Sequence, residues 1–89
     1  RDMAFIIKDD VPHQDIVRII KKASSHLFQK TDLFDVYKGE HIKEGYKSVA
    51  YRIYLQDLNA TLTDERVEEE MKKIKNAIKA EWADSKFRE

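Results

Sequence analysis

The 89-residue sequence predicts an α+β fold with the element order β-α-β-β-α-β, in which a four-stranded antiparallel sheet carries two helices on one face. Three observations lead to this prediction. Two segments repeat apolar residues at helical spacing, two others alternate apolar and polar residues, and a short apolar run opens the chain. This order of elements defines the ferredoxin-like fold.

The N-terminal part of the chain supplies the first strand and the first helix. Residues 3–7 form a short apolar run followed by charged residues, which predicts a buried strand at the centre of the sheet. Pro12 suits the first turn of a helix, and apolar residues then recur at helical spacing. These residues are Ile16, Ile19, Ile20, Ala23 and Leu27. We therefore expect a helix over residues 12–28.

Two alternating segments predict the second and third strands. Residues 32–37 alternate imperfectly between apolar and polar side chains, whereas residues 47–56 alternate clearly. The loop between them contains Gly39 and Gly45. We expect the two strands to be joined directly, as in a hairpin.

Strand parity assigns each side chain either to the helix-covered face or to the open face of the sheet. On the helix-covered face we expect Phe5, Ile7, Phe34, Val36, Val49, Tyr51, Ile53 and Leu55. On the open face we expect Ala4, Ile6, Leu33, Asp35, Tyr37, Ser48, Ala50, Arg52, Tyr54 and Gln56. The open face should therefore be small, aromatic and able to form hydrogen bonds.

The C-terminal part predicts the second helix and a short last strand. Thr63 can cap the helix, and Asp64 and Glu65 in its first turn complement the helix dipole. Its apolar stripe consists of Val67, Met71, Ile74, Ile78 and Trp82. Residues 86–88 are expected to add a fourth strand at one edge of the sheet.

Composition excludes several classes of protein. The 17 basic and 17 acidic side chains cancel, so no large positive field is expected. The absence of Cys excludes disulfides and thiolate zinc sites, and suits a reducing, cytoplasmic location. No apolar run is long enough to span a membrane. We expect residues 1–89 to form one domain, and the start at Arg1 rather than Met suggests a fragment of a longer chain.

The residues that most often carry chemistry do not form a catalytic or metal-binding pattern. His13, His26 and His41 lack the short spacing of metal ligands, and the serines lack the strained turn of a nucleophile. Two glycines cannot build a nucleotide phosphate loop. We therefore expect no catalytic residue, no metal and no cofactor in this chain.

Five side chains on the expected open face suit the binding of unpaired RNA bases. They are Asp35, Tyr37, Ser48, Arg52 and Tyr54. Aromatic rings stack on bases, while carboxylate, hydroxyl and guanidinium groups hydrogen-bond base edges or phosphates. An ordinary solvated strand face explains the same pattern, because polar and aromatic side chains populate any such face. The residues alone leave both interpretations open.

Two motifs resemble those of a known family. Residues 33–40 read Leu-Phe-Asp-Val-Tyr-Lys-Gly-Glu, and residues 47–52 read Lys-Ser-Val-Ala-Tyr-Arg. Matching segments also lie at residues 1–4, 61–67 and 87–88. The sequence resembles the ferredoxin-fold anticodon-binding domain at the C-terminus of bacterial phenylalanyl-tRNA synthetase beta subunits. Organellar single-chain synthetases end in a related domain, but Phe-Asp-Val-Tyr-Lys-Gly resembles the bacterial beta chain more closely.

The resemblance implies an RNA-binding domain without an active site. In the family, the residues corresponding to Asp35, Tyr37 and Ser48 contact anticodon nucleotides, and we add Arg52 and Tyr54 as supporting RNA contacts. The implied partners are the anticodon loop of tRNA(Phe), the rest of the beta subunit, and the alpha subunit in a tetramer with two copies of each. ATP and Mg²⁺ are implied for the parent ligase, whose catalytic site lies in the alpha subunit. The alternative class is a ferredoxin-like protein-interaction or ligand-sensing domain that binds no RNA.

Overall fold

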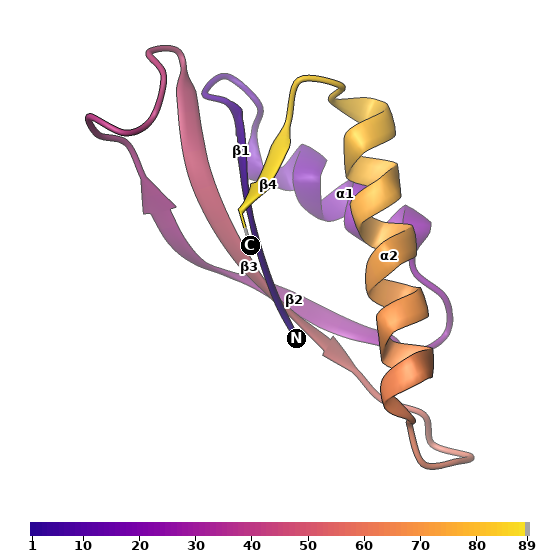
Figure 1. Cartoon of the computed structure of the whole chain (residues 1–89). Helices are drawn as coiled ribbons and strands as arrows, with labels where there is room; N and C mark the ends of the chain where they lie inside the picture. Colours follow the sequence, from indigo (N-terminus) through magenta and orange to yellow (C-terminus); the bar gives the residue numbers. More distant parts are fainter. Residues whose placement is uncertain (89) are drawn as a thin grey trace.

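The element order is the one that the sequence predicts. A computed structural model describes residues 1–88 of the chain (Figure 1). Its elements are β1 (Asp2–Lys8), α1 (His13–Ala23), β2 (Phe28–Tyr37), β3 (Tyr46–Leu55), α2 (Asp64–Glu81) and β4 (Lys86–Arg88). The short C-terminal strand, which the sequence only suggests, is present.

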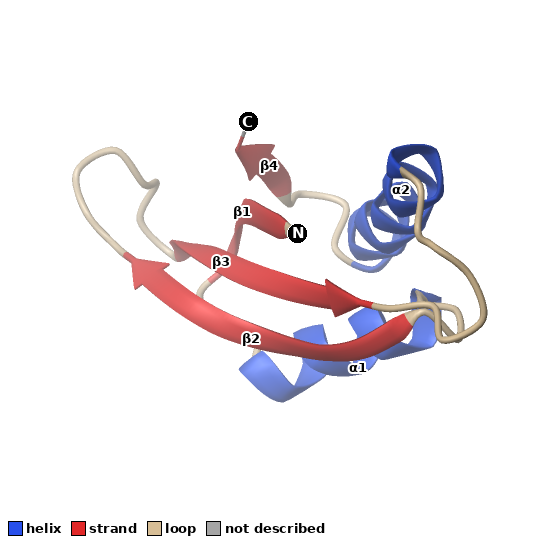
Figure 2. Cartoon of the chain, turned by 90° about the horizontal axis from the view of Figure 1, so that it is seen from below, coloured by secondary structure: helices blue, strands red, loops and turns tan. Residues whose placement is uncertain are grey.

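The four strands form one antiparallel sheet in the order β2-β3-β1-β4. β1 is central, as expected, and β4 pairs with it at one edge. Both helices pack on the same face of the sheet (Figures 1 and 2). The predicted ferredoxin-like α+β fold is therefore confirmed, and no helix within residues 1–88 covers the other face of the sheet.

The hydrophobic core lies between the helices and the inner face of β1 and β3. The strands contribute Met3, Phe5, Ile7, Val49, Tyr51 and Ile53, and the helices contribute Ile16, Ile19, Ile20, Met71, Ile74 and Ile78. The parity predicted for β1 and β3 is therefore correct. The buried hydroxyl of Tyr51 is hydrogen-bonded to Nδ1 of His13 at 2.9 Å, and burial raises its pKa.

The first helix is shorter than predicted, because it ends at Ala23 instead of residue 28. Ser24 is extended, and its hydroxyl donates to the Ile20 carbonyl at 2.6 Å, which ends the helical turn. The backbone N–H of Ser25 then donates to the Glu70 carboxylate in α2 at 2.6 Å. The chain enters β2 at Phe28, earlier than the expected residue 32.

Glu70 is a fully buried carboxylate between α2 and this segment. Besides the hydrogen bond from the Ser25 N–H, it accepts one from Nη1 of Arg66 at 3.4 Å and forms an ion pair with the Lys73 ammonium at 3.2 Å. Burial alone would raise the pKa of Glu70, but the hydrogen bonds from Ser25 and the Lys73 ammonium outweigh it and lower the pKa. The ionised carboxylate thus fixes the connection between α1 and β2.

A β-bulge in β2 overturns two of the predicted side-chain directions. Leu33 pairs with Tyr51 and Asp35 pairs with Ala50, so Phe34 is an extra residue on β2. Leu33, expected on the open face, packs against the core instead. Phe34, expected among the core residues, is 50% exposed and lies beside the Arg52 guanidinium on the open face.

Val36 keeps its predicted direction but is not covered. It lies opposite the buried Val49 on the helix side of the sheet, yet it remains 51% exposed. The end of β2 and the loop that follows it extend beyond both helices (Figure 1). β3 ends at Leu55, one residue before the predicted end.

The second helix begins where the sequence predicts. The hydroxyl of Thr63 accepts a hydrogen bond from the backbone N–H of Arg66 at 3.2 Å, which confirms Thr63 as the N-cap. Trp82 follows the last helical residue and packs, partly buried, against the core.

Candidate nucleic-acid interface

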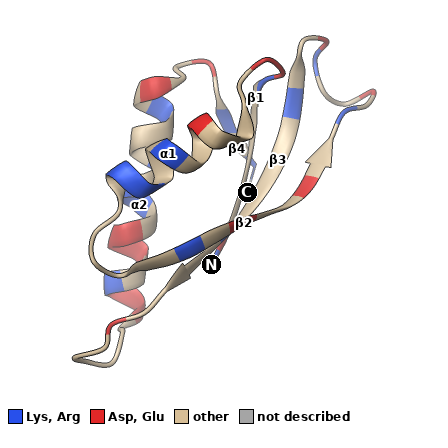
Figure 3. Cartoon of the chain, turned by 180° about the vertical axis from the view of Figure 1, so that it is seen from behind, with Lys and Arg blue, Asp and Glu red and all other residues tan. Residues whose placement is uncertain are grey.

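The open face of the sheet carries all five residues that the sequence singles out. The open face is defined by Asp2, Ala4 and Ile6 of β1, Lys30, Asp32, Phe34, Asp35 and Tyr37 of β2, Ser48, Ala50, Arg52 and Tyr54 of β3, and Lys86 and Arg88 of β4. Figure 3 shows acidic and basic residues interspersed along both helices and few charged positions along β2 and β3. A nucleic acid would therefore meet local groups on this face and not a broad positive field.

Tyr37 is 42% exposed as a residue, and its ring is held by the chain that follows it. A Cβ added to Gly39 would overlap the Tyr37 hydroxyl and would lie 2.5 Å from Cζ. The ring therefore rests directly against the Gly39 backbone. This contact gives a physical reason for Gly in the Tyr-Lys-Gly motif, and it leaves part of the ring free to stack.

Asp35 and Ser48 flank Tyr37 but differ in access to solvent. Asp35 is exposed and lies opposite Ala50, two residues before Tyr37. Ser48 lies directly opposite Tyr37 but is only 3% exposed. Its hydroxyl oxygen accepts a hydrogen bond from Nη1 of Arg88 at 2.9 Å. The fold brings the three residues together, with Ser48 covered and the other two accessible.

Arg52 is engaged by other residues of the open face. Its Nε and Nη2 donate to the two carboxylate oxygens of Asp2 at 2.8 and 3.1 Å. These hydrogen bonds raise the pKa of Arg52 and lower the pKa of Asp2. The same guanidinium lies 5.0 Å from the centroid of the Phe34 ring. Arg52 is thus fixed in place between a carboxylate and an aromatic ring.

Tyr54 lies at the far end of the open face, near the beginning of β2. The residue is 37% exposed, and the ammonium of Lys30 lies 4.6 Å from the centroid of its ring. Tyr37 lies opposite Ser48 on β3, and Ala50 and Arg52 lie between Ser48 and Tyr54 on the same face of that strand. The structure therefore groups Asp35, Tyr37 and Ser48 closely and sets Tyr54 apart.

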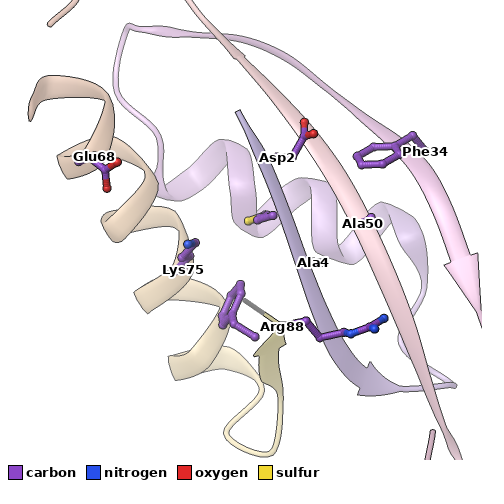
Figure 4. A pocket seen from close by; sticks show the side chains of 9 residues that line it. Asp2, Ala4, Phe34, Ala50, Glu68, Lys75 and Arg88 are labelled. Atoms are coloured by element: carbon purple, nitrogen blue, oxygen red, sulfur yellow. The ribbon is translucent and has the colours of Figure 1, made fainter. Parts of the chain in front are cut away.

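A hollow of about 520 Å³ lies beside this group (Figure 4). On the open face it is bordered by Asp2, Ala4, Phe34, Ala50 and Arg88, and it continues around the edge of β1 to Met3, Glu68, Lys75 and Phe87. Sequence reasoning missed Phe34 and Arg88. The adjacent apolar pair at residues 33–34, which cannot alternate in a regular strand, was the available signal for a bulge.

Residues 1–88 lack two further kinds of feature. No group of three His, Cys, Asp or Glu side chains in this part of the chain is arranged to hold a metal ion. None of the helices in the same residues is long and apolar enough to cross a membrane.

The fold and a family model define the class of this protein. The antiparallel sheet with both helices on one face is a ferredoxin-like domain, and residues 1–85 match the model of the ferredoxin-fold anticodon binding domain. The chain belongs to this family. The resemblance seen in the sequence is thereby confirmed.

The relatives are beta subunits of phenylalanine–tRNA ligases. The one from Neisseria meningitidis serogroup B is 42% identical over 83 residues, which cover 93% of this chain and 10% of the relative. The one from Staphylococcus haemolyticus is 43% identical over the same shares of each chain. The one from Methylococcus capsulatus is 39% identical over all of this chain and 11% of the relative. The chain thus spans about a tenth of the length of the curated relatives it matches.

Proposed function

We propose that this domain recognises the anticodon loop of tRNA(Phe) with the open face of its sheet. The observation that carries the proposal is the half-exposed Tyr37 ring, held against Gly39 beside the exposed carboxylate of Asp35. The family and the names of the relatives support the same function. Sequence-specific proteins recognise single-stranded RNA by stacking splayed bases on aromatic rings and hydrogen-bonding their edges.

Each residue of the group has a distinct role in this proposal. An unstacked anticodon base stacks on Tyr37, which is worth about 1–3 kcal/mol. The Asp35 carboxylate accepts hydrogen bonds from the edge of that base, and so favours a base with donors, such as N1–H and N2–H of guanine. Ser48 belongs to the same site together with Arg88, to which it is hydrogen-bonded.

Arg52 and Tyr54 support the RNA farther along the face. Because the chain has no net charge, we expect only about one to three phosphate contacts and a shallow dependence of affinity on salt. The isolated domain should bind weakly, and the rest of the synthetase should supply most of the affinity for tRNA.

We further propose that residues 1–89 act as one domain of a longer beta chain. In that setting the beta subunit assembles with an alpha subunit in the cytoplasm, and the alpha subunit attaches phenylalanine to tRNA with ATP and Mg²⁺. This domain holds neither cofactor and contributes recognition. The match to a tenth of each relative supports this arrangement.

A binding assay with one substitution and one matched control tests the proposal. Fluorescence anisotropy would measure the affinity of the 89-residue chain for a labelled anticodon stem-loop of tRNA(Phe). Tyr37→Ala should weaken binding by about 1–3 kcal/mol. Val36→Ala, next to it on the other face and at least as exposed, should not change it. Equal losses in both variants, or none in Tyr37→Ala, would count against RNA binding by this face and favour a protein-interaction domain.

A further inference from the structure

We propose that the hollow between Phe34 and Arg88 is a second nucleobase site, separate from the one on Tyr37. Its floor is formed by Ala4 and Ala50, and its occupant is the base of a nucleotide next to the one that stacks on Tyr37. The inference rests on the proposed function, because it takes the same RNA as the ligand. It adds Phe34 and Arg88 to the residues that contact that RNA.

The Phe34 ring forms one wall because of the bulge in β2. The extra residue turns Phe34 onto the open face, where half of this large apolar side chain is exposed. Its partner there is the Arg52 guanidinium, which Asp2 fixes with two hydrogen bonds. A ring held by an immobilised cation is a preorganised stacking surface, and Phe34 is one of the side chains that line the hollow (Figure 4).

The floor of the hollow is flat and apolar. Ala4 and Ala50 are paired across β1 and β3, the two central strands, where larger side chains would fill the space above the sheet. The whole hollow, including its continuation past the edge of β1, has a volume of about 520 Å³, within the range of small-molecule sites of about 300–1,000 Å³, and the space over Ala4 and Ala50 is the part of it on the open face. Two methyl groups side by side suit the face of a planar ring.

Arg88 supplies the polar wall. It is paired with Ala4 from the neighbouring strand, and its Nη1 donates to Ser48 at 2.9 Å across β1. This hydrogen bond holds the guanidinium at the border of the hollow. Arginine donors match the oxygen and ring-nitrogen acceptors of a base edge, and they also match a phosphate. In this arrangement the almost fully buried Ser48 holds Arg88, and Arg88 meets the RNA.

The position of the hollow favours RNA over an unrelated small molecule. Asp35, which is proposed to contact the first base, lies opposite Ala50, which forms the floor. Tyr37 lies opposite Ser48, which holds Arg88. The two sites thus share neighbouring residues, and consecutive bases of a splayed loop can occupy both.

Methyl NMR and two substitutions test the second site. In a chain labelled with ¹³C-methyl alanine, the anticodon stem-loop of tRNA(Phe) should shift Ala4 and Ala50 by ring currents. Ala77 and Ala80 of α2 should not shift. Phe34→Ala should weaken binding about 5- to 150-fold, the equivalent of one lost stacking contact. Ala50→Val, which fills the floor with a strand-forming side chain, should also weaken binding, whereas Val36→Ala should not.

The outcomes separate this inference from the proposed function. If Tyr37→Ala weakens binding while Phe34→Ala and Ala50→Val bind normally and the Ala4 and Ala50 methyls do not shift, the second site is wrong and the proposed function stands. If the unmodified chain does not bind the stem-loop, both are wrong. Loss of affinity in Ala50→Val with an unchanged melting temperature supports the second site even if Phe34→Ala fails to fold.

Discussion

Tyr37 lies so close to Gly39 that no side chain larger than hydrogen fits at Gly39 without moving the tyrosine ring. The φ angle of Gly39 is not positive, so its backbone conformation does not itself require glycine. Gly45, in the same loop, has a φ of 89° and has no atom within 4 Å of an added Cβ. The two glycines therefore serve different purposes, one for a side-chain contact and the other for the backbone.

Substitution of each glycine by alanine should separate these purposes. Gly39→Ala should leave the free energy of unfolding nearly unchanged but weaken binding to the anticodon stem-loop, because the Tyr37 ring is displaced. Gly45→Ala should cost about 1–2 kcal/mol of stability through backbone strain and leave the affinity unchanged. Urea denaturation and fluorescence anisotropy would measure the two quantities. Normal binding by Gly39→Ala would show that the position of the ring is not important for RNA.

Asp35 should determine which base is preferred. A carboxylate accepts hydrogen bonds but cannot donate them, so a guanine that loses its N2 amino group should bind less well. Replacing the guanine of the anticodon by inosine should cost about 1.5–3 kcal/mol with the unmodified domain. The same change should cost little with Asp35→Ala, which has no side-chain acceptor. A similar penalty for both proteins would assign the amino group to another partner.

Ser48 and Arg88 should act as one unit. If Ser48 holds Arg88 and does not itself touch the RNA, Ser48→Ala and Arg88→Gln should each weaken binding. The double variant should then be no weaker than Arg88→Gln alone. Additive losses in isothermal titration calorimetry would instead indicate an independent contact from the Ser48 hydroxyl.

Glu70 should make the stability of the fold depend on pH in the acid range. Its pKa is lower in the folded protein than the ordinary value of 4.5. The ionised carboxylate therefore stabilises the fold above about pH 4.5, and this contribution is lost as the pH falls towards the folded pKa. Glu70→Gln should lower the free energy of unfolding by about 1.5–3 kcal/mol at pH 7.

The variant should also lose part of the acid sensitivity. Asp2 and Asp84 have lowered pKa values as well, so some acid destabilisation should remain in Glu70→Gln. Urea denaturation between pH 3 and 7 would measure the free energy of unfolding of both proteins. This pH range includes the ordinary pKa of a carboxyl group, which is about 4. If the stability of the two proteins changed with pH in the same way, folding would not favour the ionised form of Glu70.

Local sequence patterns were sufficient where neighbouring residues determine the structure. The alternation in β3 and the stripe in α2 correctly predict the apolar positions that pack in the core, because each follows the period of its own element. The end of α1 could not be predicted in this way. Residue 28 continues an apolar pattern, but Ser25 is held by Glu70, which lies 45 positions away in the sequence.

The same limit applies to the candidate site. Parity places Asp35, Tyr37 and Ser48 correctly on the open face, but it does not anticipate the bulge that exchanges the directions of Leu33 and Phe34. It also gives no indication that Ser48 is covered, because Arg88 reaches it from a strand 40 positions later. Phe34 and Arg88 become candidates only when the pairing of all four strands is known.

The most direct test of the account is an NMR titration of the ¹⁵N-labelled domain at low salt, where weak RNA binding is strongest. One RNA would be the anticodon stem-loop of tRNA(Phe), and the other would be the same stem with a scrambled anticodon. We expect shifts at Asp35, Tyr37, Ser48 and their neighbours with the first RNA only. Shifts on the outer edge of β2 or on the helices, identical shifts with both RNAs, or no shifts at all would contradict anticodon recognition by the open face.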